Sequence, residues 1–274
     1  GVVFNMRKYG GNGYWLGVIL SGVIFTAGFA VDVNEPLKKG DCLEAARTDL
    51  GKWPNRLFED SKSTFLRMDN IAALMLAGGA SIAMHNTDAD KNIAENMERH
   101  RTFKGFADEG LNIFGGPGIH FAATGIWYAI SANRGDDFNK DRAWTMMTAL
   151  ATTGIVTVSL KAIVNNKAPN GTNWAWPSGH TASSFTVASV LDEFYGPEVG
   201  IPAYGLASVV AWRMMDTGDH WASDVVFGGV LGWVVGHTIA GKHKQMEVAG
   251  FQVMPLTASI DGSPASGIMF TKFF

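Results

Sequence analysis

Apolar residues in the second half of the chain recur with helical spacing in four stretches, which shorter polar segments separate. They predict helices over Ala143–Val164, Thr181–Glu193, Ala203–Met215 and from His220 or Ser223 to Ala240. The segment Asn165–Asn173 is rich in turn residues and predicts a loop. No stretch is long and apolar enough to require a membrane span, and the buried helices of a soluble bundle explain the pattern equally well.

The first half of the chain is less regular. It predicts a short helix over Asp41–Leu50, a packed helix over Ile71–Met84 and an exposed, charged helix pair within 88–104. A further apolar segment, Leu111–Ser131, contains a Gly-Gly-Pro-Gly run that predicts a loop. After Phe251, Gly, Ser and Pro separate short apolar pieces, which predicts a short strand or a loose tail.

The first thirty residues have the pattern of an export signal. Basic residues at Arg7 and Lys8 precede the apolar stretch Tyr14–Phe29, and small residues surround Ala30. We therefore expect cleavage after Ala30. A retained membrane anchor is the alternative, because the apolar stretch is near the lower length limit for a span. Either outcome places the chain in the periplasm or at a membrane.

These elements together predict an all-α protein in four parts. Residues 1–30 are the signal peptide or anchor, and 31–110 form an N-terminal helical segment. Residues 111–245 form the helical core, and 246–274 form a C-terminal tail. The length of 274 residues is ample for a sizeable hydrophobic core.

Composition narrows the class of protein. Apolar residues make up 47% of the chain and charged residues 17%, which indicates a secreted or membrane-associated protein with much buried surface. A net charge of −3 gives no overall attraction for nucleic acid, so no nucleic-acid partner is expected. Cys42 is the single cysteine, which excludes an internal disulfide framework and a cysteine metal cluster. We predict no cofactor and no metal ion, and the sequence leaves the oligomeric state open.

The segment Pro177-Ser178-Gly179-His180 predicts the start of a helix that carries candidate anion-binding and proton-transfer groups. Ser178 is a good N-cap, and Gly179 allows close approach of the backbone to a ligand. The free N–H groups at a helix start suit a phosphate-like anion. His180 adds an imidazole that exchanges protons near neutral pH.

Two further positions extend this motif. Lys161 lies upstream, near the end of a predicted helix, and His220 with Asp224 lies downstream at the start of another. In this order and at these separations, the residues resemble the type 2 phosphatidic acid phosphatase family. Its superfamily includes bacterial non-specific acid phosphatases and the vanadium haloperoxidases. The resemblance covers about Phe114 to Ala240 and implies a helical bundle of that kind.

The chemistry of these residues suits hydrolysis of a phosphomonoester without a metal ion. His220 is the candidate nucleophile, and Asp224, four residues later, can orient its ring. His180 is the candidate general acid. Ser178, Gly179 and Lys161 are the candidate phosphate-binding groups. The resemblance implies these same roles and a covalent phosphohistidine intermediate.

Two arginines of the family pattern are replaced, by Ala168 in the first motif and by Met214 in the third. Each has a basic neighbour one residue earlier, Lys167 and Arg213, which are the candidate substitutes. A shift of one residue turns a helical side chain by about 100°, so Arg213 would need a bulge near the end of its helix. Lys167 lies in the predicted loop and has more freedom.

Four functions are therefore compared. The first is a phosphatase acting on a phosphorylated small molecule or a lipid phosphate, with a membrane surface as a further partner. The second is a catalytically weak family member that binds an anionic ligand or acts as a scaffold, because two arginines are missing. The third is a vanadate-dependent peroxidase, and the fourth is a purely structural membrane protein. The segments Asp41–Lys62 and His85–Gly110 are expected to set the substrate.

Overall fold

A computed structural model describes residues 42–243 and the stretches 14–15, 30–31, 246–248, 251–260 and 263–271. The helices in this part are α1 (Cys42–Phe65), α2 (Met68–Asn86), α3 (Ala89–Arg99), α4 (Phe106–Gly115), α5 (Pro117–Arg134), α6 (Asp137–Val164), α7 (Gly179–Tyr195), α8 (Pro197–Asp216) and α9 (Ala222–His243). The strands are β1 (Tyr14–Trp15), β2 (Ala30–Val31), β3 (Met246–Val248), β4 (Phe251–Ile260) and β5 (Ser263–Thr271).

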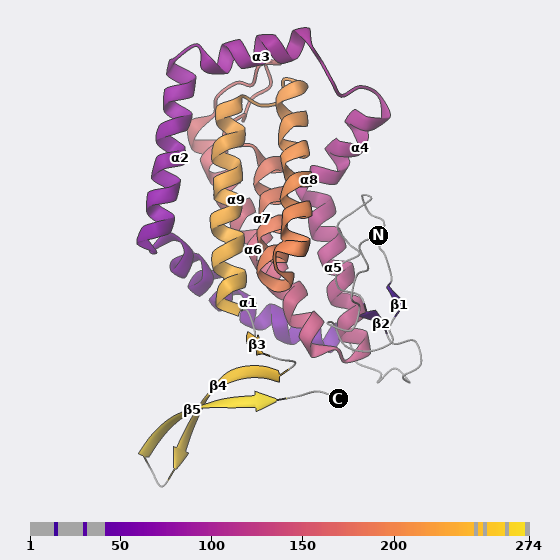
Figure 1. The fold of residues 1–274 in the computed structure, drawn as a ribbon, viewed down its shortest axis with the longest axis vertical. Coiled ribbons are helices and arrows are strands. Elements are labelled where there is room, and N and C mark those ends of the chain that lie inside the picture. The colour runs from indigo at the N-terminus through magenta and orange to yellow at the C-terminus, as the bar shows by residue number, and fades with distance from the viewer. Residues whose placement is uncertain are drawn as a thin grey trace.

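Helices α5 to α9 run side by side as a bundle, with α2 along one flank (Figure 1). Helix α7 is central and packs against α6, α8 and α9. Helix α3 crosses one end of the bundle, and α1 crosses the opposite end (Figure 1). Helices α6 and α8 end, and α7 and α9 begin, at the end that α3 crosses. The predicted motif residues therefore lie at this one end.

The central helix α7 packs against its neighbours with short side chains. Its buried residues are mostly Ser, Thr, Ala and Val, and none of them is charged. The hydroxyl groups bond within the bundle: Thr186 Oγ1 donates to the Ala182 carbonyl oxygen at 2.8 Å and pairs with Thr153 Oγ1 at 2.8 Å. Because most of these hydroxyl groups have partners inside the protein, the helix can be buried on most sides.

Three glycines bring α9 into main-chain contact with α7. Gly228, Gly232 and Gly236 recur every four residues, so they share one face of α9. A Cβ atom added at Gly228 would lie 2.7 Å from the carbonyl oxygen of Ser178, and one at Gly232 would overlap that of Ala182. We call these three residues the glycine seam. Only glycine permits the two helices to lie this close.

The four second-half helices and the all-α bundle are confirmed, although α6 and α8 each begin six residues earlier than predicted, at Asp137 and Pro197. The first half required corrections. The helix expected to stop at Leu50 continues through Pro54 to Phe65 as α1. Leu50 is half exposed, so water can bond the carbonyl group that Pro54 leaves without a donor.

Two further expectations change in detail. The charged helix pair expected within 88–104 is a single helix, α3, followed by an extended link. The segment Leu111–Ser131 is divided between α4 and α5, which meet at Gly116 because Pro117 starts a new helix.

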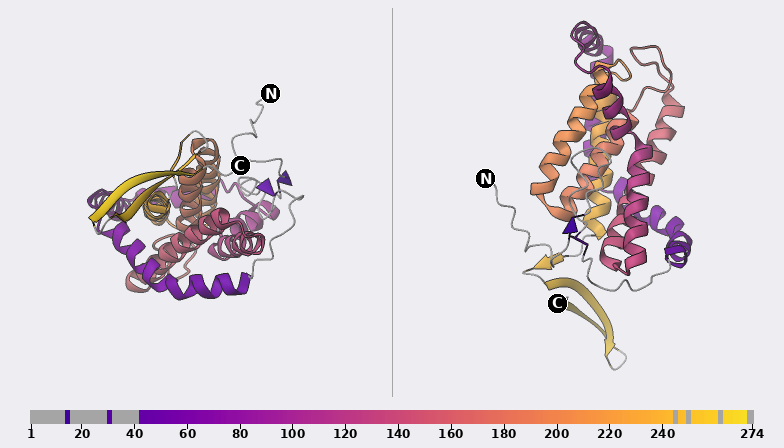
Figure 2. Two further views of the ribbon diagram at one scale, coloured as in Figure 1. Left: turned by 90° about the horizontal axis from the view of Figure 1, so that it is seen from below. Right: turned by 90° about the vertical axis from the view of Figure 1, so that its right-hand side faces the viewer.

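The C-terminal residues form an antiparallel sheet in the order β3-β4-β5, which extends away from the helices (Figure 2). This is more ordered than the short strand or loose tail expected there. Strands β1 and β2 pair with each other. The remaining residues of the predicted signal segment 1–30 lie outside the described part of the chain, so its cleavage stays a prediction.

Two described helices, α6 and α9, are long and apolar enough to cross a membrane on length and composition alone. Most of α9 is buried inside the bundle, whereas α6 is exposed over more of its length.

Candidate active site

The predicted nucleophile and its orienting acid form a pair at the start of α9. His220 Nδ1 lies 3.2 Å from Asp224 Oδ2, and both side chains are nearly buried. The same carboxylate oxygen accepts a hydrogen bond from the Trp221 N–H at 2.9 Å. With Nδ1 donating to Asp224, the lone pair of the His220 ring is on Nε2. That nitrogen is the one available as a nucleophile.

The start of α7 is fixed directly against this pair. The Ser178 N–H donates to the carbonyl oxygen of Asp224 at 3.1 Å. Ser178 also caps α7, since its Oγ accepts from the N–H and the hydroxyl of Thr181 at 3.4 and 3.0 Å. The predicted N-cap is therefore confirmed. Because the capping Oγ is fully buried, a phosphoryl oxygen reaches this helix start most directly at the neighbouring N–H groups.

His180 faces the pair from the first turn of α7. Burial, together with the positive charges of His220 and Arg213, lowers the pKa of His180 to about 4. Its Nε2 would be 3.8 Å from a Cβ atom added at Gly116, and a backbone hydrogen bond joins its ring to Asn112. The ring thus lies between the α4–α5 junction and His220. The two imidazoles come from separate segments, the first turn of α7 and the residues before α9, and are close enough for their charges to interact.

Lys161 reaches the same place from α6. Its Cε would be 3.9 Å from a Cβ atom added at Gly179, so the side chain runs along the start of α7. The ammonium group donates to the carbonyl oxygens of Trp174 and, at 3.1 Å, Ala175. The structure therefore brings Lys161, Gly179 and the two histidines together at one end of the bundle.

Arg213 differs from the expectation. It lies within the regular helix α8, so the bulge that it would need to take the place of the arginine is absent. Its guanidinium donates to Asp108 Oδ1 from Nε at 2.7 Å and forms an ion pair with Asp219. Two carboxylates thus hold the charge of Arg213 beside His180. Met214, where the family has arginine, is buried in a small apolar cluster with Ala211 and Val225.

Lys167 also lies next to the site, and its contact with Trp221 is made by its main chain. Its carbonyl oxygen accepts a hydrogen bond from Trp221 Nε1 at 2.7 Å, and it forms an isolated β-bridge with Asn173. The residue itself is exposed. Ala168, the other position that lacks its arginine, is buried at 4% exposure. The loop thus presents the main chain of Lys167 beside Trp221.

Sequence reasoning did not identify several residues around the site. Asp108 and Asp219 bind Arg213, and His120 lies behind His180 with its Nδ1 buried and without a partner. Burial and the positive charge of His180 lower the pKa of His120 to about 4. Asp108 comes from a charged segment, Asp219 from a turn and His120 from an apolar helix, so no shared local signal distinguishes them.

Comparisons with known proteins find matches to the helical core that carries these residues. The family model of the PAP2 superfamily matches residues 142–245. A segment of 72 residues is 38% identical to the lipid A 1-phosphatase of Porphyromonas gingivalis, and it covers 25% of this chain but only 16% of that protein.

Two solved structures are similar in fold. The transmembrane PAP2 type phosphatidylglycerolphosphate phosphatase of Bacillus subtilis has a TM-score of 0.51 and 17% identity, over 65% of this chain and 96% of that one. LpxE of Aquifex aeolicus has a TM-score of 0.45 and 18% identity, over 53% of this chain and 90% of that one. The matched segment 142–245 contains Lys161, the start of α7 and the His220–Asp224 pair. The resemblance predicted from the motifs is therefore confirmed: residues 142–245, which form most of the helical core, match the PAP2 superfamily model.

Proposed function

We propose that this protein is a lipid-phosphate phosphatase that hydrolyses a phosphomonoester through a phosphohistidine intermediate. The observation that carries the proposal is the oriented His220–Asp224 pair with His180 facing it from another helix. A lipid substrate is supported by the activities of the similar proteins, a lipid A 1-phosphatase and a phosphatidylglycerolphosphate phosphatase. It is supported further by the many large apolar side chains on the outer surface of the helices.

In the first step, His220 Nε2 attacks phosphorus. The P–N bond forms while the bond from phosphorus to the leaving oxygen breaks, and His180 donates a proton to that oxygen. Asp224 stabilises the positive charge that develops on the His220 ring. Lys161 and the N–H groups at the start of α7 hold the remaining phosphoryl oxygens. To do so, the Lys161 ammonium exchanges a loop carbonyl for a phosphoryl oxygen.

In the second step, water attacks the phosphohistidine. His180, now neutral, takes a proton from the water as the new P–O bond forms. The P–N bond breaks, its electron pair returns to Nε2, and inorganic phosphate leaves. The side chains and the attacking water supply every proton and electron pair in the two steps, so the reaction is expected to continue in the presence of a metal chelator.

The test is phosphate release by the purified chain from phosphatidic acid in detergent micelles. We expect His220→Ala to abolish the release, whereas His237→Asn, on the same helix but away from the site, leaves it unchanged. Acid-labile labelling of the protein by ³²P-substrate should disappear with His220→Ala. Full activity without His220 would contradict the mechanism.

A second candidate function is favoured by one observation: the guanidinium of Arg213 is held by Asp108 and Asp219 and both arginine positions of the family are buried and uncharged. With fewer charges for the phosphate, the chain would bind an anionic ligand without hydrolysing it. Vanadate binding by an unaltered chain that releases no phosphate from any phosphomonoester would favour this function. Release at an ordinary enzymatic rate would exclude it.

A further inference from the structure

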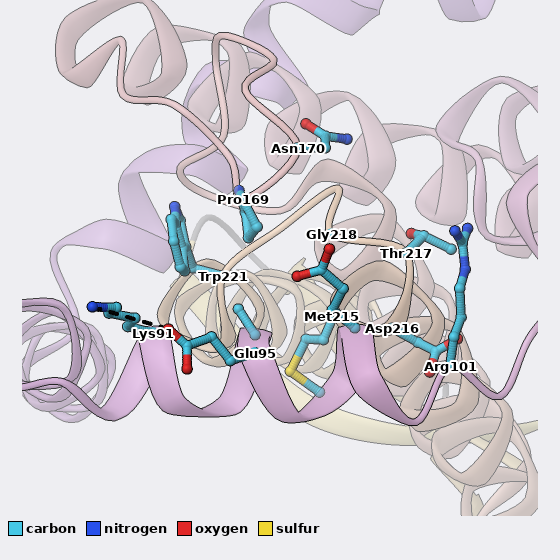
Figure 3. Close-up of a pocket in the computed structure, with 12 residues that line it drawn as sticks. Lys91, Glu95, Arg101, Pro169, Asn170, Met215, Asp216, Thr217, Gly218 and Trp221 are labelled. Atoms are coloured by element: carbon cyan, nitrogen blue, oxygen red, sulfur yellow. Dashed lines mark ion pairs between the residues drawn. The ribbon is translucent and has the colours of Figure 1, made fainter.

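The segment that carries His220 is fastened at both of its ends to the region around α3. This segment, Asp216–Ser223, joins the end of α8 to the start of α9. Helix α3 crosses the bundle at this end (Figure 1) and runs alongside the segment in Figure 3. A cavity of about 280 Å³ lies between them, with Lys91 and Glu95 of α3 on one side and Trp221 on the other. α3 precedes the segment that the family model matches.

The first fastening is Asp90, in the first turn of α3. Its side chain is buried, and its Oδ1 accepts from the Ser223 N–H at 2.9 Å. Its Oδ2 accepts from the Ser223 hydroxyl at 2.5 Å. A carboxylate from another helix thus accepts from an N–H group in the first turn of α9, where intrahelical acceptors are missing. Its negative charge also interacts favourably with the positive end of the α9 dipole. The bond lies one residue before Asp224, which orients the nucleophile.

In the second fastening the carboxylate belongs to α8 and the N–H groups follow α3, the reverse of the first. Asp216, the last residue of α8, is 2% exposed, and its carboxylate accepts from two main-chain N–H groups that follow α3. Thr102 N lies 2.8 Å from Oδ1, and Phe103 N lies 2.8 Å from Oδ2. The acid is therefore on α3 at one end of the segment and on α8 at the other. Both carboxylates are buried and hydrogen-bonded, which is costly to arrange without a structural purpose.

The carbonyl group of Ser223 is also hydrogen-bonded. Ser81 Oγ of α2 donates to the Ser223 carbonyl oxygen at 3.2 Å. The same hydroxyl accepts from Trp176 Nε1 at 2.9 Å, and Trp176 immediately precedes the helix start that carries His180. The Ser81 side chain, which lies outside the matched family segment, therefore connects the two histidine-bearing segments.

We propose that Asp90 and Asp216 are positioning residues, which hold the segment Asp216–Ser223 so that His220 Nε2 points at the phosphate. This inference rests on the proposed phosphatase function. Asp90 bonds the main chain of Ser223, and Asp216 bonds the main chain of Thr102 and Phe103, so both act on His220 through the main chain. A displacement of the nucleophile by about 1 Å lowers the rate about 100-fold even when the substrate still binds.

The experiment compares Asp90→Ala and Asp90→Asn with Asp88→Ala, an exposed aspartate at the N-cap of the same helix that makes no capping bond. We expect Asp90→Ala to lower kcat by about 10- to 100-fold with little change in KM. Asp90→Asn keeps an acceptor for the Ser223 N–H and should recover much of the loss. Asp88→Ala should have wild-type kinetics. Asp216→Asn should resemble Asp90→Asn.

A second readout does not depend on turnover. In ¹⁵N-histidine spectra, the Nδ1 proton of His220 reports its hydrogen bond to Asp224, and we expect that signal to shift or broaden in Asp90→Ala but not in Asp88→Ala. If the wild-type chain released no phosphate, the proposed function would fail while this spectrum still tested the fastening. An Asp90→Ala variant with wild-type kcat and an unchanged His220 signal would overturn the inference.

Discussion

At the scale of single residues, the protonation of His180 governs the proposed chemistry. Burial, together with the charges of His220 and Arg213, lowers the pKa of His180 to about 4, so this ring is neutral at pH 7 in the ligand-free site. A general acid must carry its proton. The negative charge of a bound phosphate favours the protonated ring, so binding of the anion must take up a proton.

This requirement gives a prediction for pH dependence. The pKa of His180 is lower in the ligand-free site than in the anion-bound site. Sulfate is a dianion over the whole range, so its affinity should fall as pH rises from 5 to 8. If binding takes up one proton, the affinity for sulfate falls by at most about tenfold per pH unit. Trp221, next to His220, offers a fluorescence signal for the titration. His180→Gln should flatten the dependence, and an equally steep slope in that variant would contradict the assignment.

The two missing arginines lead to a second prediction at this scale. Met214 is 1% exposed and packs with Ala211 and Val225, so an arginine there would bury its charge among apolar side chains. We expect Met214→Arg to lower the free energy of unfolding by about 3–5 kcal/mol rather than to restore activity. Met214→Leu, of similar volume, should cost less than about 1.5 kcal/mol. Thermal unfolding of both variants measures the difference, and a stable, more active Met214→Arg would refute it.

At the scale of elements, the glycine seam determines how α7 and α9 meet. A Cβ atom at Gly232 would overlap the Ala182 carbonyl oxygen, so Gly232→Ala must push the helices apart. We expect this change to destabilise the protein by about 1–3 kcal/mol, although alanine is the better helix former. Gly241→Ala on the same helix, where the nearest atom would be 3.7 Å away, is the matched control. Equal unfolding midpoints for the two variants would contradict this account.

The elements also show what the sequence could and could not predict. Helices α6 to α9 were predictable because each is an apolar run between turn residues, and the site because Ser178, His180, His220 and Asp224 lie within short motifs. The role of Asp90 was not predictable. An aspartate on a charged helix has the pattern of an exposed residue, and only the tertiary contact with Ser223 shows otherwise.

At the scale of the whole molecule, large apolar side chains cover much of the outer surface. Met75 and Leu76 of α2 are more than 70% exposed, and Ile155 of α6 and Trp233 of α9 are also exposed. Such a surface is typical of contact with lipid. The sequence left soluble and membrane-associated bundles open, because it does not show which apolar residues face outward.

We therefore predict that the expressed protein sediments with membranes and needs detergent for extraction. Sodium carbonate at high pH should leave it in the pellet if helices such as α6 are embedded. Recovery of the chain in the supernatant before any detergent is added would contradict this prediction.

The direct contact of two backbones through the glycine seam limits how such a protein can diversify. A side chain at a helix interface can be exchanged for a slightly larger or smaller one, which adjusts spacing in small steps. No such step exists where Gly228 meets the carbonyl group of Ser178. New substrate preferences must therefore arise in the surrounding loops and in α3, and directed-evolution libraries for this scaffold should leave the seam fixed and vary those parts.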